Sequence, residues 1–343
     1  MAGKMEEIRF KILIFMILVS STLYSQDIHF TQFFSSPATV NPALAGFSNS
    51  RFRFFLNHRN QWAAVSVPFQ TFAASVDAQI IKRKEKGDMI GIGLSAFSDK
   101  AGDSKFGTQQ ASLSLSYVSV LGNSNRNLLG FGIQASFVQR SLDYNALYFD
   151  NQYNGSIFDP SRPTGETFAV SNYSYPDLSA GINWFTNISY DFSLQTGFSL
   201  WHLNRPVQSL KDDKSVRLST KGVFYSEAEI TLSKPYRLMP AIFFQRQGTF
   251  SELMIGSRFK YIIEKNRYAY SAFITGLFYR NRDAIALLTG FEYKNMKLGL
   301  SYDFNISSLH PASNYRGGLE IYFTWKLSEK HYKKPKDLPC PIF

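Results

Sequence analysis

The sequence predicts an all-β protein, a transmembrane antiparallel β-barrel of about 14 strands. Three observations support this prediction. Many segments alternate apolar and polar residues with a period of two, as a strand with two different faces does. Beyond the N-terminal segment, no stretch has the roughly 18 uninterrupted apolar residues that a membrane-spanning helix needs. The connections between the alternating segments also fall into a short set and a long set, and the two sets alternate along the chain.

The segment at 318–327 shows the alternation most clearly. Every second residue is large and apolar, and the positions between them are mostly polar or small. The apolar set is Leu319, Ile321, Phe323, Trp325 and Leu327. A helix would mix the two sets, whereas a strand separates them onto opposite faces. This segment alone leaves open a soluble sandwich, with the apolar face in a core, and a membrane barrel, with that face in lipid.

The N-terminus has the pattern of a secretory signal peptide. Lys4, Arg9 and Lys11 precede a short apolar run at 12–19, which is followed by small polar residues. The run is too short to span a membrane, so we expect cleavage after Ser25 and assign residues 1–25 to the signal peptide. The chain has a single cysteine, so no disulfide can form within it despite the exported location.

The mature chain divides into three predicted parts. Residues 26–50 form an N-terminal arm, because Pro37 and Pro42 make a central strand improbable there. Residues 51–327 form the barrel, and residues 328–343, which lack alternation, form a short periplasmic tail. We expect both termini of the mature chain on the periplasmic side. Glycine and serine residues on the polar face of the first strands leave space in the lumen, which suggests that the arm enters the barrel as a plug.

Loop lengths separate the membrane barrel from the soluble alternative. If residue 51 starts at the periplasmic side, all periplasmic turns are short and the longest connections are external. The predicted external loops include 141–175, 204–219 and 305–314. Bacterial outer-membrane barrels sort their loops in this way, and a soluble sandwich has no reason to do so. We therefore place the apolar faces in outer-membrane lipid.

The formal net charge of +11 indicates acidic contacts. For an exported protein, the expected partners are an acidic protein or anionic lipid headgroups, and not nucleic acid. No phosphate-binding glycine loop and no nucleic-acid module is present in the sequence. The histidines have no paired metal-ligand spacing, so we expect no metal and no cofactor.

One polar motif lies at the predicted end of the first strand. It consists of Asn57, Arg59, Asn60, Gln61 and Trp62. Arginine offers a rigid fork of donors and tryptophan a flat anchor, so the motif could hold the arm or a partner at a barrel rim. The alternative is a purely structural network with a tryptophan at the membrane interface.

His202 lies near Ser199 and Asp191 in the sequence, which raises the possibility of a hydrolase triad. No nucleophile elbow or oxyanion motif accompanies them. A packed or rim histidine is the favoured interpretation, and we expect no enzymatic activity.

Several short motifs together resemble the PorP/SprF family of type IX secretion system outer-membrane proteins. The residues that carry the resemblance are Gln26, Asp27, His29, Phe30, Gln32 and Phe33, then Asn41, Pro42, Ala43 and Gly46, then Asn57, Arg59, Asn60, Gln61 and Trp62, then Ser199, His202, Leu203 and Pro206, and finally Cys340, Pro341 and Phe343. The resemblance covers nearly the whole mature chain. It implies a non-enzymatic barrel that anchors or helps export a large secreted surface protein, such as an adhesin, together with other components of that system.

This resemblance selects the residues expected to bind a partner or the arm. They are Asn41, Pro42, Gly46, Asn57, Arg59, Asn60, Gln61, Trp62, His202, Pro206, Cys340 and Phe343. The external loops are expected to contact the secreted cargo, and the tail to contact periplasmic components of the system. The alternative function is an outer-membrane channel for small or hydrophobic solutes, which barrels of about this size also form.

Overall fold

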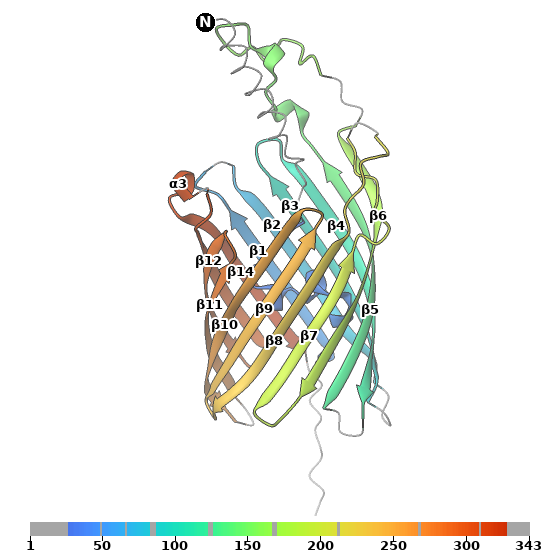
Figure 1. Ribbon diagram of the computed structural model, residues 1–343, viewed down its shortest axis with the longest axis vertical. Helices are drawn as coiled ribbons and strands as arrows, with labels where there is room; N and C mark the ends of the chain where they lie inside the picture. The colour runs from blue at the N-terminus through green and yellow to red at the C-terminus, as the bar shows by residue number, and fades with distance from the viewer. Residues whose placement is uncertain are drawn as a thin grey trace, which may run out of the picture.

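Fourteen strands among the described residues pair antiparallel in chain order, and the first closes the ring against the last in the computed structural model (Figure 1). The structure describes residues 27–48, 50–65, 67–82, 87–122, 126–166, 170–210, 213–266, 269–308 and 310–327. The predicted signal peptide and tail, with Cys340 and Phe343, lie outside these residues. The predicted transmembrane antiparallel barrel and its strand number are confirmed.

The strands are β1 (Phe52–Gln61), β2 (Phe69–Lys82), β3 (Met89–Ala101), β4 (Phe106–Leu121), β5 (Asn127–Ser141), β6 (Asn172–Asn187), β7 (Phe192–Trp201), β8 (Lys221–Ser233), β9 (Tyr236–Gln247), β10 (Phe250–Lys265), β11 (Tyr270–Arg280), β12 (Ala284–Tyr293), β13 (Met296–Asn305) and β14 (Arg316–Leu327). Most are ten residues or longer, which suits a tilted strand that crosses a bilayer.

The alternation in the sequence gives the barrel its two faces. Large apolar side chains such as Ile133, Phe137 and Leu277 point outward and are more than half exposed on the isolated chain. Polar side chains on the other face, such as Ser114, Gln134 and Asn183, are buried in the interior. A wall with this polarity fits lipid outside and a polar lumen inside. No helix among the described residues is long and apolar enough to cross a membrane.

The two ends of the barrel differ as the loop lengths predict. The turns after β2, β4, β6, β8, β10 and β12 are short, and the long connections after β5, β7 and β13 lie at the opposite end (Figure 1). The long-loop end is therefore the external end. One predicted boundary is wrong: the loop expected at 141–175 ends earlier, because β6 begins at Asn172 and pairs Tyr173 and Tyr175 with β5.

The arm, which the structure describes over residues 27–48, lies inside the barrel. It contains the short helices η1 (Phe33–Ser35), α2 (Pro37–Val40) and η2 (Pro42–Leu44). Phe33, Val40 and Leu44 form the interior core with side chains of β7 to β12, including Phe243 at a ring distance of 4.9 Å from Phe33. Burying a phenylalanine in this way contributes about 1.5–3 kcal/mol relative to leaving it in water.

The direction of the arm corrects one prediction. Asp27, the first described residue, contacts His202 and Lys221 at the external end, and the arm then runs toward the start of β1 at the short-turn end. The expectation of a periplasmic N-terminal end is therefore wrong for the described part of the arm. The physical reason is an ion pair: a buried carboxylate needs cationic partners, and these partners follow β7 and begin β8.

Candidate functional site

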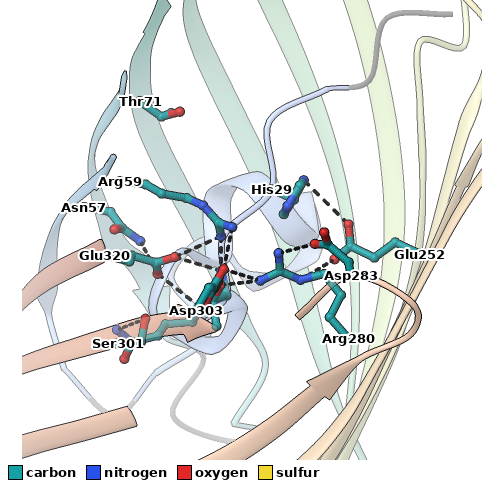
Figure 2. A network of polar contacts seen from close by, with 12 residues as sticks. His29, Asn57, Arg59, Thr71, Glu252, Arg280, Asp283, Ser301, Asp303 and Glu320 are labelled. Carbon is teal, nitrogen blue, oxygen red and sulfur yellow. Dashed lines mark hydrogen bonds and ion pairs between the residues drawn. The ribbon is translucent and has the colours of Figure 1, made fainter. Parts of the chain in front are cut away.

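A buried ion network holds the arm to the barrel wall (Figure 2). Arg59 of β1 pairs with Asp303 of β13 at 2.8 Å and with Glu320 of β14 at 3.3 Å. Arg280 of β11 pairs with the same Asp303 oxygen at 2.8 Å. All four side chains are at least 95% buried. Pairing is what allows charges to be buried at all, so each member depends on the others.

Thr31 of the arm is the centre of this network. Its hydroxyl accepts from Arg59 at 2.8 Å and from Arg280 at 2.6 Å, and it donates to Asp303 at 3.0 Å. A hydroxyl has one donor and two lone pairs, so its capacity is fully used. The Glu320 carboxylate also accepts from the backbone N–H groups of Thr31 at 2.8 Å and Gln32 at 3.1 Å. The wall thus recognises both the side chain and the backbone of the arm.

Glu320 and Arg59 face each other across the seam that closes the barrel. The β1–β14 register places them directly opposite. Next to them, Asn57 donates to Glu320 at 3.3 Å. Further along the arm, His29 lies 3.5 Å from Glu252 of β10. The network in Figure 2 therefore joins both edges of the seam to the arm.

A second set of contacts, the rim latch, consists of Asp27, Asp177, His202 and Lys221. The His202 ring lies between two carboxylates, with Nε2 2.7 Å from Asp27 and Nδ1 2.9 Å from Asp177. The Lys221 ammonium is 2.8 Å from Asp27. Burial by itself would lower the pKa of His202, but the two carboxylates outweigh burial and raise the pKa to about 9. Burial disfavours the charged form of Asp27, yet Lys221 and His202 hold the pKa of this carboxyl well below its ordinary value.

The rim latch predicts a pH dependence. Because the pKa of His202 in the folded protein is about 9 and its ordinary value is 6.5, the stabilisation is complete below 6.5 and is lost as the pH rises through 9. The difference in free energy of unfolding between the wild type and His202→Gln should therefore shrink between pH 7 and 10. Chemical denaturation at several pH values measures it. His310→Gln, whose ring lies 2.9 Å from the Ser307 carbonyl oxygen and not between carboxylates, is the matched control for the substitution.

The barrel wall also has a seat for the middle of the arm. The Asn41 amide donates to the carbonyl oxygens of Ile182 at 2.8 Å and Phe198 at 3.3 Å, on β6 and β7. Its oxygen accepts from Ala43 N–H at 2.9 Å and so caps η2. Pro42 and Ala43 rest directly on Gly132 of β5, where any side chain would collide with their backbone.

Gly46 packs closely against the wall at the short-turn end. Its φ of +62° favours glycine, and a Cβ there would lie 2.6 Å from the Ala78 carbonyl oxygen and 2.7 Å from Gly91. Its N–H donates to Asp77 at 3.1 Å. Asn41, Pro42 and Gly46 therefore all contact the wall.

The residues of the polar motif at the end of β1 point to different faces of the barrel wall. Asn57, Arg59 and Gln61 point inward, whereas Asn60 lies on the outward face. Trp62 lies past the strand end at the external rim, and its ring packs edge-on against Phe69 at 4.8 Å. The motif therefore does not act as one cluster, since alternate residues of a strand face opposite sides. Pro206 is buried in the external loop after β7 and accepts from Leu218 N–H at 2.9 Å.

Sequence reasoning did not find the acidic partners. Asp177, Glu252, Asp303 and Glu320 each occupy an inward position of a strand, so the alternation marks them only as polar luminal residues. One signal was available for Glu320: the first and last strands of a barrel must pair, and an inward arginine on one strand calls for an inward carboxylate on the other.

No hydrolase triad is formed by His202. Its partners are Asp27 and Asp177, while Asp191 lies in a turn at the opposite end of the barrel. The Ser199 hydroxyl donates to the Val40 carbonyl at 2.6 Å, inside the arm seat. Within the described part of the chain, no group of three or more His, Cys, Asp or Glu side chains is arranged to hold a metal ion.

The external loop at 142–171, which the structure describes over 142–166 and 170–171, projects beyond the barrel rim in its described part (Figure 1). Its hydrogen bonds are largely within itself, such as Asp159 N–H to the Gln152 carbonyl at 2.8 Å. It nevertheless exposes large apolar side chains, with Tyr148 at 77%, Ile157 at 65% and Tyr153 at 53%. Lipid accounts for exposed apolar groups on the strands, but these groups lie beyond the strand ends. Exposed apolar groups gathered in this way are typical of a protein-binding surface.

These features define an outer-membrane β-barrel whose lumen holds its own N-terminal arm and whose external loops are long. The chain belongs to the PorP/SprF family: the family model for the type IX secretion system membrane protein PorP/SprF matches residues 22–325. It is thus an outer-membrane component of that secretion system, in a family of secretion or transport proteins, and the family implies contact with other components of the system. No curated protein matches the chain.

Solved barrels of low sequence identity share the general architecture. The CymD monoaromatic hydrocarbon channel has 11% identity and a TM-score of 0.49, covering 87% of this chain and 94% of its own. The Pseudomonas putida toluene transporter TodX has 10% identity and a TM-score of 0.48, covering 88% and 94%. The Ralstonia pickettii toluene transporter TbuX has 9% identity and a TM-score of 0.46, covering 85% and 94%.

Proposed function

We propose that this barrel retains a specific secreted protein at the cell surface through its external loops, as a non-enzymatic part of type IX secretion. The observation that supports the proposal is the exposed apolar surface of the 142–171 loop, which projects beyond the barrel rim. The anchored arm supports it as well, because a lumen filled by a salt-bridged segment suits a binding platform better than an open pore. The tail at 328–343 contacts periplasmic components in this proposal.

The test is a pair of alanine substitutions on the loop. Tyr148→Ala with Ile157→Ala should release the secreted protein from the cell surface into the medium, with retention reduced roughly tenfold or more, because buried aromatic anchors dominate interfaces. Retention is measured by labelling surface proteins on intact cells and comparing them with the culture medium. Tyr190→Ala is the matched control, since Tyr190 is fully exposed at the opposite, short-turn end. Equal retention in all three strains contradicts the proposal.

A channel for small solutes remains the second candidate, and one observation favours it. A small cavity of about 40 Å³ lies between the arm and the wall at the external end, lined in part by Phe55, Ala73, Thr108, Arg140 and Trp201. Its apolar walls with a few polar groups are the mixture typical of small-molecule sites, but it is too small for a solute while the arm is seated. A channel requires the arm to leave its seat, and conductance measurements on the wild-type barrel separate the two functions.

A further inference from the structure

Strand β6 is paired on only one side over its external half. Its ladder with β5 extends up to Asn172, opposite Ser141, but its ladder with β7 stops at Ala180, opposite Leu200. β7 ends early because His202, with a φ of +59°, turns the chain into the lumen to reach Asp27 and Asp177. The rim latch therefore opens a gap in the wall beside β6.

The backbone N–H and C=O groups of β6 that do not pair with β7 all point into this gap. Leu178 is satisfied there, since it accepts from Leu203 N–H at 2.9 Å and donates to Asn204 at 3.1 Å. The Pro176 carbonyl accepts from the Asn204 amide at 2.7 Å. Successive residues of a strand direct their backbone groups to opposite neighbours, so Asn172 and Ser174 point the same way as Leu178. Their N–H and C=O groups on this side meet no partner among the described residues.

The external loop after β7 does not fill the gap. Its residue Gln208 lies on the luminal side, where the side chain lies against the Arg140 guanidinium. Leu218 packs inside against Val138 and Tyr175. Asn172 and Ser174 remain exposed on the outer side. A closed barrel has no free strand edge, so these groups are exceptional in this fold.

We propose that the edge from Asn172 to Pro176, which we call the β6 edge, receives an extended segment of the secreted partner as an added strand. This inference rests on the proposed function and names how the partner binds. Strand addition uses main-chain hydrogen bonds, which the two free N–H and C=O pairs offer. Pro176 has no N–H and its carbonyl is occupied, so the added strand ends there. The β6 edge directly follows the loop that carries Tyr148 and Ile157, so one partner can contact both.

The test depends on one backbone group, the N–H of Ser174. Ser174→Pro removes the N–H that faces the gap, whereas Ser174→Ala changes only the side chain. The ladder with β5 is kept in both variants, because the Ser174 N–H does not point toward β5, and proline is tolerated on a strand edge. A photo-crosslinking amino acid replaces Asn172 as the probe in cells that express the full chain. The Ser174→Pro variant should reduce crosslinking to a secreted protein roughly tenfold, as loss of one hydrogen bond and the added ring predict, and Ser174→Ala should not.

The outcomes separate the inference from the proposed function. Equal crosslinking in both Ser174 variants, or equal loss in both, overturns the inference, as does a crosslink to a second copy of this chain. If Tyr148→Ala with Ile157→Ala releases the partner while Ser174→Pro retains it, the proposed function stands and strand addition is wrong. Heat-modifiable migration of the folded barrel is checked in each strain. If the Ser174→Pro variant fails to assemble, the two positions are exchanged: proline replaces Asn172 and the photo-crosslinking amino acid replaces Ser174. The outcomes are then interpreted in the same way.

Discussion

Arg59→Met is expected to lower the free energy of unfolding of the barrel by about 3–5 kcal/mol, a large share of the stability of a typical protein. The guanidinium neutralises Glu320 and shares Asp303 with Arg280, in a site with almost no access to water. Methionine fills much of the volume but leaves a buried carboxylate without its cation. Denaturant-induced unfolding, followed by the electrophoretic shift of the folded barrel, measures the change in the free energy of unfolding.

Two further variants make the result specific. Arg246→Met removes an arginine from the outward face of β9 at the rim, so it should change the free energy of unfolding little. Arg59→Met combined with Glu320→Gln removes the orphaned charge together with its partner and should recover part of the loss. If the single and double variants are equally unstable, the seam ion pair is not what holds this part of the barrel.

Gly132→Ala is expected to drive the arm from its seat and let the barrel conduct ions. The new methyl group would occupy the space of the Pro42 and Ala43 backbone, and backbone cannot rotate away as a flexible side chain can. Overpacking of this kind costs about 1–3 kcal/mol, which favours the unseated arm by roughly 5- to 150-fold. Planar-bilayer recordings of the purified protein should show opening events that are rare in the wild type.

The matched control is on the same strand and the same face. At Gly130 an added Cβ would lie 3.4 Å from the Ala43 carbonyl oxygen and 3.6 Å from the Asn183 carbonyl oxygen, which is ordinary contact. Gly130→Ala should therefore behave as the wild type does. A wild-type barrel that already conducts like an open porin would refute the idea that the arm closes the lumen, and it would favour the solute channel.

The alternation of residues predicted the barrel well because it is a local property. A few residues of each strand are enough to indicate its lipid-facing side, and loop length indicates which end is external. Strand number and orientation can therefore be predicted from short segments. The start of β6 was missed because Pro176 and the tyrosines beside it look like loop, although pairing with β5 makes Asn172 to Leu178 part of the strand. The residue pattern of a single segment does not indicate whether the segment pairs with one neighbouring strand or with two.

The contacts of the arm could be predicted only in part. Asn41, Gly46, Arg59 and His202 were selected by family resemblance, and all of them contact or belong to the arm. The partners in these networks are far apart in the sequence: Arg59 and Glu320 are separated by 261 positions, and Thr31 and Glu320 by 289. Such pairs depend on the register at closure and on the direction of the arm, and neither is encoded locally. For the same reason, the sequence placed the beginning of the arm at the wrong end.

The position of Glu320 has a consequence for biogenesis. This residue belongs to the final strand, yet its carboxylate accepts hydrogen bonds from the backbone amides of residues 31 and 32, which are synthesised near the start of the mature polypeptide. A cylinder that closed while empty would leave that carboxylate without these two amide donors. We therefore expect the leading residues and the closing strand to stabilise each other, so that sealing and filling of the cylinder are coupled.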